Sequence, residues 1–204
     1  AARLKLRYAV VTSVTRDDLP DGGAAHFARV IRAVRGRLPE TGVEVLTPDF
    51  AGDTEAIACV LAAGPTVFNH NIETCERLTE EIRSGADYRR SLRVLETASR
   101  RANGKTRIKS GLMLGLGERD DEIRTVLNDL RSSGVELLTM GQYLAPGRHH
   151  RPVDRYVSPE TFEEWGRVAL EEYGFTYVAS GPQVRSSYMA EQAAEVADAR
   201  EASN

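Results

Sequence analysis

Residues 108–143, IKSGLMLGLGERDDEIRTVLNDLRSSGVELLTMGQY, decide the fold of this chain. The stretch begins with an apolar run, Ile108 to Leu114, of the length and character of a buried strand. Four apolar residues then recur at the spacing of one helix face: Ile123, Val126, Leu127 and Leu130. A helix stop follows at Ser133-Gly134, and Val135 to Tyr143 forms a second apolar run. The order strand, helix, strand predicts two parallel strands joined by a crossover helix.

The same alternation occupies most of the chain. Further strands are predicted at Tyr8 to Val14, Val43 to Leu46, Thr66 to Asn69 and Phe175 to Ala179. Helical spacing is present in 27–38, 57–61, 88–95 and 162–173, and the tail from Met189 is predicted to be helical or frayed. We expect an α/β fold in one domain, 1–204, with a partial β/α barrel to about residue 157 and an extension over 158–204. A barrel is preferred over a dinucleotide-binding sheet because the first strand–helix turn lacks G-x-G-x-x-G.

Composition bounds the class of protein. The 204 residues are 41% hydrophobic and 28% charged, which is typical of a globular domain. A net charge of -3 gives no overall reason to expect nucleic acid or an acidic membrane as a partner. No apolar run approaches the ~20 residues that span a bilayer. Cys59 and Cys75 fit a reduced compartment better than a disulfide framework. Ala1 is not Met, and the first residues resemble the end of a helix, so we expect the natural protein to begin upstream.

Polar residues gather after the predicted strands, where parallel β/α folds bind their ligands. They are Thr12, Ser13, Arg16, Asp17 and Asp18 after the first strand, Asp49 after the second, Asn69, His70, Asn71 and Glu73 after the third, Lys109, Gly111, Met113, Gly115 and Glu118 along and after the fourth, and Gln142, Tyr143, Arg148, His149 and His150 after the fifth. A rim of this composition can hold a polar ligand that carries carboxylate, amine and hydroxyl groups.

Each of these features also has a purely structural interpretation. Asp17 and its neighbours can belong to a solvated turn, and His149 with His150 can belong to a surface loop. The glycine-rich stretch after Lys109 could cradle a phosphate, but it lacks the Gly-Lys-Ser/Thr of a nucleotide-hydrolysing loop. No nucleophile elbow supports a serine triad. Cys59 falls on the apolar side of its helix and is expected to be a core residue.

Taken together, the segments resemble the lipoyl synthase family of radical S-adenosylmethionine (SAM) enzymes. The resemblance rests on the following stretches: 11–28 (VTSVTRDDLPDGGAAHFA), 43–50 (VEVLTPDF), 67–74 (VFNHNIET), 85–92 (GADYRRSL), 109–118 (KSGLMLGLGE), 141–162 and 178–188 (VASGPQVRSSY). Small departures occur at Thr15, Thr47 and Cys75. Matches of this length in the family's order are more specific than any single motif.

The resemblance implies a six-stranded partial (β/α)6 barrel of the radical SAM type, of which this chain lacks the first strand. It implies SAM bound on a [4Fe-4S] cluster, and a second, auxiliary [4Fe-4S] cluster. The expected reaction is the insertion of two sulfur atoms at C6 and C8 of an octanoyl chain on a carrier-protein lysine. The implied partners are an octanoylated lipoyl domain or glycine-cleavage carrier protein and an electron donor such as ferredoxin or flavodoxin. The implied compartment is the bacterial cytoplasm or the mitochondrial matrix.

Roles follow from the resemblance residue by residue. The cofactor-binding candidates are Thr12, Ser13, Asp17, Asn69, Asn71, Glu73, Lys109, Gly111, Met113, Gly115, Glu118, Gln142 and Tyr143. The substrate-binding candidates are Arg148, His149 and Arg185. Within Arg185-Ser186-Ser187-Tyr188, Ser187 is favoured as a ligand of the auxiliary cluster, with Ser186 the second choice. No residue is expected to act as an acid–base catalyst, because the hydrogen abstraction uses a radical derived from SAM.

The family's two cysteine triplets would lie upstream of Ala1, and Cys59 and Cys75 match neither of them. Because such clusters are held mainly by thiolates, we expect this chain alone to hold no cluster and to be inactive. Two other interpretations stay open. One is a degenerate SAM barrel that binds a ligand or partner without catalysis. The other is an unrelated barrel isomerase or aldolase that uses Lys109 and Glu73, for which borohydride trapping of a Schiff base would be the test.

Overall fold

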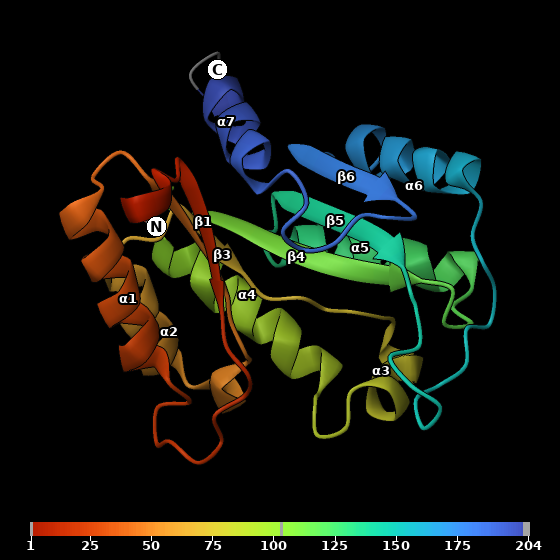
Figure 1. Cartoon of the computed structure of the whole chain (residues 1–204). Helices are drawn as coiled ribbons and strands as arrows, with labels where there is room; N and C mark the ends of the chain where they lie inside the picture. The colour runs from red at the N-terminus through yellow and green to blue at the C-terminus, as the bar shows by residue number, and fades with distance from the viewer. Residues whose placement is uncertain (1, 103, 202–204) are drawn as a thin grey trace.

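The computed structural model describes residues 2–102 and 104–201, so the expectation for Ala1 lies outside the described residues. The strands are β1 (Tyr8–Thr12), β2 (Gly42–Leu46), β3 (Val67–Asn69), β4 (Arg107–Leu114), β5 (Leu137–Gln142) and β6 (Tyr177–Gly181). The helices are α1 (Ala24–Arg37), α2 (Thr54–Ala62), α3 (Glu76–Ile82), α4 (Tyr88–Ala102), α5 (Asp120–Ser132), α6 (Pro159–Glu171) and α7 (Ala190–Glu201), and two short 3₁₀ turns are η1 (Ala2–Leu4) and η2 (Phe50–Gly52) (Figure 1).

All six strands form one parallel sheet in the order of the chain, β1-β2-β3-β4-β5-β6. Within the described residues the sheet is open: β1 pairs with β2, β6 pairs with β5, and β1 and β6 do not pair with each other. The predicted α/β class and partial barrel are therefore confirmed. Strand β1 is an edge strand, and its residues Tyr8 to Val11 are only half-buried.

The two faces of the sheet are covered differently (Figure 1). Helices α1 to α6 contribute their apolar sides to one large core, which includes Ile31, Leu95 and Leu127. Helix α7 contributes Ala193 and Ala194 to a separate small cluster near the start of the strands. Between β6 and α7 the chain runs back across the strands, so the C-terminal segment shares a face of the sheet with α7.

Local sequence signals explain the helix boundaries. Ser158 caps α6 by accepting a hydrogen bond from the Thr161 amide, and Pro159 occupies the first turn. Helix α3 was not predicted: its seven residues bury only Leu78 and Thr79, which is too few to produce a clear helical pattern. None of the described helices combines the length and apolar character that crossing a bilayer requires.

Candidate functional site

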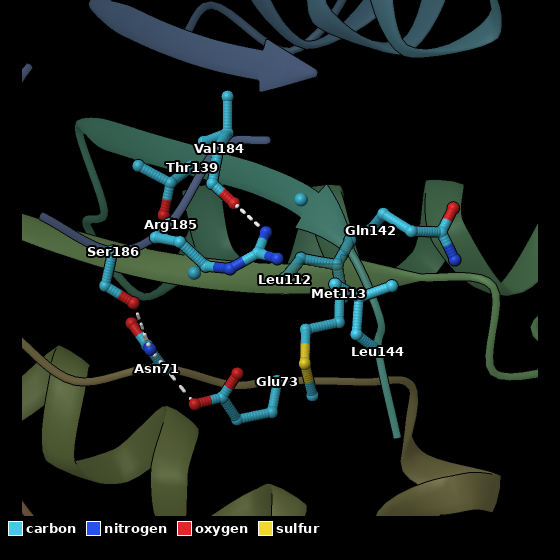
Figure 2. A pocket seen from close by; sticks show the side chains of 12 residues that line it. Asn71, Glu73, Leu112, Met113, Thr139, Gln142, Leu144, Val184, Arg185 and Ser186 are labelled. Carbon is cyan, nitrogen blue, oxygen red and sulfur yellow. Dashed lines mark hydrogen bonds between the residues drawn. The ribbon is translucent and has the colours of Figure 1, made fainter. Parts of the chain in front are cut away.

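A cavity of about 310 Å³ opens at the carboxyl ends of β4 and β5, beside the segment that follows β3 (Figure 2). It is lined by Asn71, Glu73, Gly111, Leu112, Met113, Thr139, Gly141, Gln142, Leu144, Val184, Arg185 and Ser186. Parallel β/α folds bind ligands at this end of their strands, so the cavity lies where the sequence predicted a site.

Asn71 is the central polar side chain of the cavity. It is 7% exposed, and its Nδ2 donates to Glu73 Oε1 at 3.0 Å and to Ser186 Oγ at 2.6 Å. Its Oδ1 is buried and has no hydrogen-bond partner among the described residues. An unpaired buried acceptor costs about 1–3 kcal/mol. The Asn71 side chain is therefore suited to accept a hydrogen bond from a ligand N–H or O–H group.

Glu73 enters the cavity from a strained backbone conformation, with φ of 66° at a residue that is not glycine. Its amide donates to the Gly111 carbonyl at 2.9 Å, and its own carbonyl accepts from the Met113 amide at 2.8 Å. These bonds tie the segment after β3 to β4. Burial raises the pKa of the Glu73 carboxyl, against the lowering effect of the hydrogen bond from Asn71. The carboxyl group can therefore retain a proton more readily than an exposed glutamate.

Gly111 leaves the space that Asn71 uses. A Cβ atom at this position would lie 2.7 Å from Asn71 Oδ1 and 3.0 Å from Thr139 Oγ1, both too close for ordinary contact. The absence of a side chain on β4 thus allows the amide of Asn71 and the hydroxyl of Thr139 to approach the same region of the cavity.

Two buried polar side chains hold the loops around the cavity. The carboxylate of Glu118 accepts from the amides of Gly115 and Leu116, each at 2.8 Å, and so closes the turn after β4. Gln142 Nε2 donates to the Arg155 carbonyl at 3.0 Å, and its Oε1 accepts from the Val157 amide at 2.9 Å. Glu118 and Gln142 therefore shape the turn after β4 and the segment that leads to α6.

The structure brings seven of the predicted site residues together in this cavity: Asn71, Glu73, Gly111, Met113, Gln142, Arg185 and Ser186. Gly115, Glu118 and Tyr143 lie next to it in the supporting loops, and Tyr143 Oη donates to the Arg151 carbonyl at 2.8 Å. Thr139 and Leu144 were not named from the sequence. The alternation of side chains along β5 could have identified Thr139, because it places Thr139 on the same face of the strand as Gly141.

Lys109 and Asn69 do not line the cavity. Lys109 Nζ lies 2.9 Å from Glu44 Oε1 and Asn69 Nδ2 donates to the same oxygen at 2.9 Å, and the lysine and the glutamate are completely buried. Lys109 precedes Gly111 by two residues on β4 and so lies on the same face, one step farther from the carboxyl end. The pairing of Lys109 with Glu73 that an aldolase-like site would need is absent from the described residues, since Lys109 pairs with Glu44.

The remaining predicted residues lie apart from the cavity. Thr12 and Ser13 line a separate hollow between β1 and α1, and Asp17 is exposed. Arg148 and His149 are exposed in the loop after β5. The exposed Ser187 does not line the cavity, whereas its neighbour Ser186 does.

The residues present fit the two expected kinds of cofactor differently. For SAM, the cavity offers the unpaired Asn71 Oδ1, the Glu73 carboxyl group and the Arg185 guanidinium, which suit a ligand with hydroxyl, ammonium and carboxylate groups. For a cluster, no group of three or more His, Cys, Asp or Glu side chains within the described ranges is placed to hold a metal. Cys59 is half-buried on α2 and Cys75 is buried at the start of α3. These side chains do not form a cluster-binding set.

Comparisons with known proteins agree with this geometry. A model of the radical SAM superfamily matches residues 1–130. The chain is 57% identical over 196 residues to the lipoyl synthase of Methylococcus capsulatus, covering 96% of this chain and 60% of the relative. It is 52% identical over 193 residues to that of Caldicellulosiruptor saccharolyticus, covering 95% of this chain and 67% of the relative. The chain thus spans about 60% of the length of the curated relatives that it matches first.

Solved structures support the fold alone. Methylornithine synthase superimposes with a TM-score of 0.60 at 12% identity, over 88% of this chain and 59% of that one. The [FeFe]-hydrogenase maturase HydG gives a TM-score of 0.66 at 17% identity, over 87% of this chain and 41% of that one. The superfamily model and the sequence relatives show that the chain belongs to the radical SAM superfamily and, within it, to the lipoyl synthase family.

Proposed function

We propose that the complete protein represented by this chain is a lipoyl synthase. It inserts one sulfur atom at C6 and one at C8 of an octanoyl group carried on a protein lysine. The observation that carries this proposal is the 57% identity to a lipoyl synthase through 96% of the chain. The polar cavity at the strand ends supports it, because seven of the residues chosen from the resemblance converge there.

The chain's own residues serve to bind and orient SAM. An unactivated C–H bond is beyond acid–base chemistry, and bound SAM with its [4Fe-4S] cluster supplies the radical chemistry. Asn71 and Glu73 offer acceptors for hydroxyl or ammonium groups, and Arg185 offers a donor for a carboxylate. Met113 and Leu112 give the cavity an apolar wall. Such a wall would help to exclude water from the bound cofactor.

The number of clusters and the partners form part of the proposal. Two [4Fe-4S] clusters are expected, one for SAM and one auxiliary, with cysteine ligands supplied by residues outside this chain. Ser187 is the favoured serine ligand of the auxiliary cluster and Ser186 the second choice; of the two, Ser186 lines the cavity. The carrier is an octanoylated lipoyl domain or glycine-cleavage protein, and the reductant is a ferredoxin or flavodoxin. The compartment is the bacterial cytoplasm or the mitochondrial matrix.

Iron and sulfide content after anaerobic reconstitution tests the proposal. The chain of 204 residues is compared with a version extended upstream to include the family's cysteines. We expect about eight irons in the extended form, as two four-iron clusters require, and none in the short form. With SAM, a reductant and an octanoyl-lysine peptide, the extended form should release 5′-deoxyadenosine and yield a lipoyl-lysine peptide, and the short form should be inactive.

A degenerate SAM barrel without catalysis predicts a different result. The extended form would then bind SAM but release no 5′-deoxyadenosine and leave the octanoyl peptide unchanged. Stoichiometric cluster binding by the short chain would contradict the assignment of the ligands to residues outside it.

A further inference from the structure

The segment Pro182–Met189, between β6 and α7, forms one wall of the cavity. Val184 and Arg185 of this segment lie against β5, and Ser186 faces Asn71 (Figure 2). The approach to β5 is close: a Cβ atom at Gly141 would lie 2.2 Å from the Val184 carbonyl oxygen. The segment thus packs directly against the backbone of β5, and the shape of the cavity depends on the position of the segment.

Within the described residues, a single side-chain hydrogen bond ties this wall to the segment after β3. Asn71 Nδ2 donates a hydrogen bond of 2.6 Å to Ser186 Oγ, and the two residues are 115 positions apart in the sequence. Among the described residues, no other hydrogen bond joins 182–189 to the segment after β3 or to any strand except β6. The other hydrogen bonds of the segment are local. Those of the backbone run from the Val184 amide to the Gly181 carbonyl, from the Tyr188 amide to the Arg185 carbonyl and from the Ala193 amide to the Met189 carbonyl.

Arg185 belongs to the same segment and directly precedes Ser186 in the chain. Its guanidinium reaches over the cavity, but the acceptors that it finds among the described residues are only the carbonyls of Val184 at 2.6 Å and Pro182 at 3.4 Å, both in its own segment. No carboxylate in the described part of the chain lies within ion-pair distance of it. The guanidinium is therefore available to an anionic group of a ligand, and its place is set by the backbone on either side of it.

We propose that Asn71 is a positioning residue that, through Ser186, holds the C-terminal segment and its Arg185 guanidinium at the cavity. Glu73 completes the arrangement, because it accepts the second hydrogen of the Asn71 amide at 3.0 Å and so fixes the direction of the first. The nature of the anionic ligand group rests on the proposed function. The positioning contact itself is a property of this chain without cofactor or substrate.

Amide hydrogen exchange of 182–189 in the purified chain tests the proposal. Asn71→Ala and Ser186→Ala should each raise the exchange rates of the Val184 and Tyr188 amides about five-fold, as expected for the loss of one hydrogen bond of ordinary net strength. The double variant should exchange no faster than either single variant, because both changes remove the same bond. Amides of β4 and β5 should keep their wild-type rates.

Two further variants separate positioning from a general loss of structure. Ser186→Thr keeps the hydroxyl acceptor and should retain wild-type exchange. Ser187→Ala removes the neighbouring exposed hydroxyl and should have no effect. If Asn71→Ala fails to fold, these variants and Ser186→Ala still decide the matter. The proposal would be overturned if Ser186→Ala left the amide exchange rates of 182–189 unchanged. It would also be overturned if the increase in the double variant equalled the product of the two single increases. Because no SAM, cluster or substrate is present, the outcome is independent of whether lipoyl synthase activity is found.

Discussion

Lys109 and Glu44 form an ion pair in which both side chains are completely buried, with Nζ 2.9 Å from Oε1 and 3.2 Å from Oε2. The pair joins β4 to β2 across the intervening β3, and Asn69 of β3 donates to the same carboxylate at 2.9 Å. Three adjacent strands are thereby fixed relative to one another just before the ends that carry the cavity. The pair therefore acts on the site indirectly, through the placement of the strands.

Replacement of Lys109 by Met should destabilise the fold by about 3–5 kcal/mol, because it leaves the Glu44 carboxylate buried without its cation. The free energy of unfolding, measured by urea denaturation, checks this value. Arg100→Met is the matched control: it breaks the exposed Arg100–Glu96 pair and should cost less than about 1 kcal/mol. The double variant Glu44→Leu with Lys109→Met should recover part of the loss, since no buried charge remains unpaired. A loss from Lys109→Met as small as that of the control would contradict this role.

His70 makes the stability of the chain depend on pH. Burial is the largest influence and lowers the pKa of His70 from 6.5 to about 4, while the hydrogen bond to the Thr47 carbonyl opposes this shift. The unfolded chain therefore binds a proton at a higher pH than the folded chain does. The stabilisation that neutral His70 contributes is complete above pH 6.5 and decreases as the pH falls toward 4. At pH 5 the free energy of unfolding is lower by about 2 kcal/mol for this reason.

His70→Gln should remove this contribution. Urea denaturation at pH 7 and pH 5 should show a smaller decrease in the free energy of unfolding for the variant than for the wild type, by about 2 kcal/mol. Comparing the two decreases removes the effect of the carboxyl groups that titrate in both proteins. Equal decreases would show that His70 is protonated in the folded chain at pH 5.

Glu118 should be required for the turn after β4. Glu118→Ala leaves the amides of Gly115 and Leu116 without an acceptor in a buried position, which costs about 1–3 kcal/mol for each. Glu118→Gln keeps one side-chain oxygen as an acceptor and should lose less. Thermal unfolding of the two variants distinguishes these cases, and similar midpoints would show that the amides find water in the alanine variant.

The sheet could be predicted from sequence because each strand is an apolar run between polar turns, and the order of runs and helices leaves few topologies. Helix α3 could not, because seven residues with two buried side chains give no clear period. The position of the cavity could also be predicted, because parallel β/α folds bind ligands at the carboxyl ends of their strands. This rule follows from the parallel topology alone and needs no knowledge of side-chain contacts.

Individual site residues were harder to predict because their partners lie far away in the chain. Lys109 precedes Gly111 by two residues in the same motif. Its partner Glu44 is distant in the chain and was not among the predicted site residues. Only this ion pair shows that Lys109 lies beside the cavity and does not line it. Ser186 and Ser187 are adjacent, and which of them faces Asn71 is set by the path of an irregular segment. Periodicity carries no information about such a path.

Gly141→Ala should displace the C-terminal wall of the cavity. The new Cβ would lie 2.2 Å from the Val184 carbonyl oxygen, which is backbone and cannot rotate away, so the segment itself must move. We expect a loss of about 1–3 kcal/mol in the free energy of unfolding, as is usual for overpacking. Faster amide exchange in 182–189 should accompany it. Gly181→Ala is the matched control, because its Cβ would meet only Val184 Cγ2 at an ordinary 3.5 Å. Equal free energies of unfolding for the two variants would mean that segment 182–189 does not pack against β5. The cavity would then lack the wall that contains Arg185.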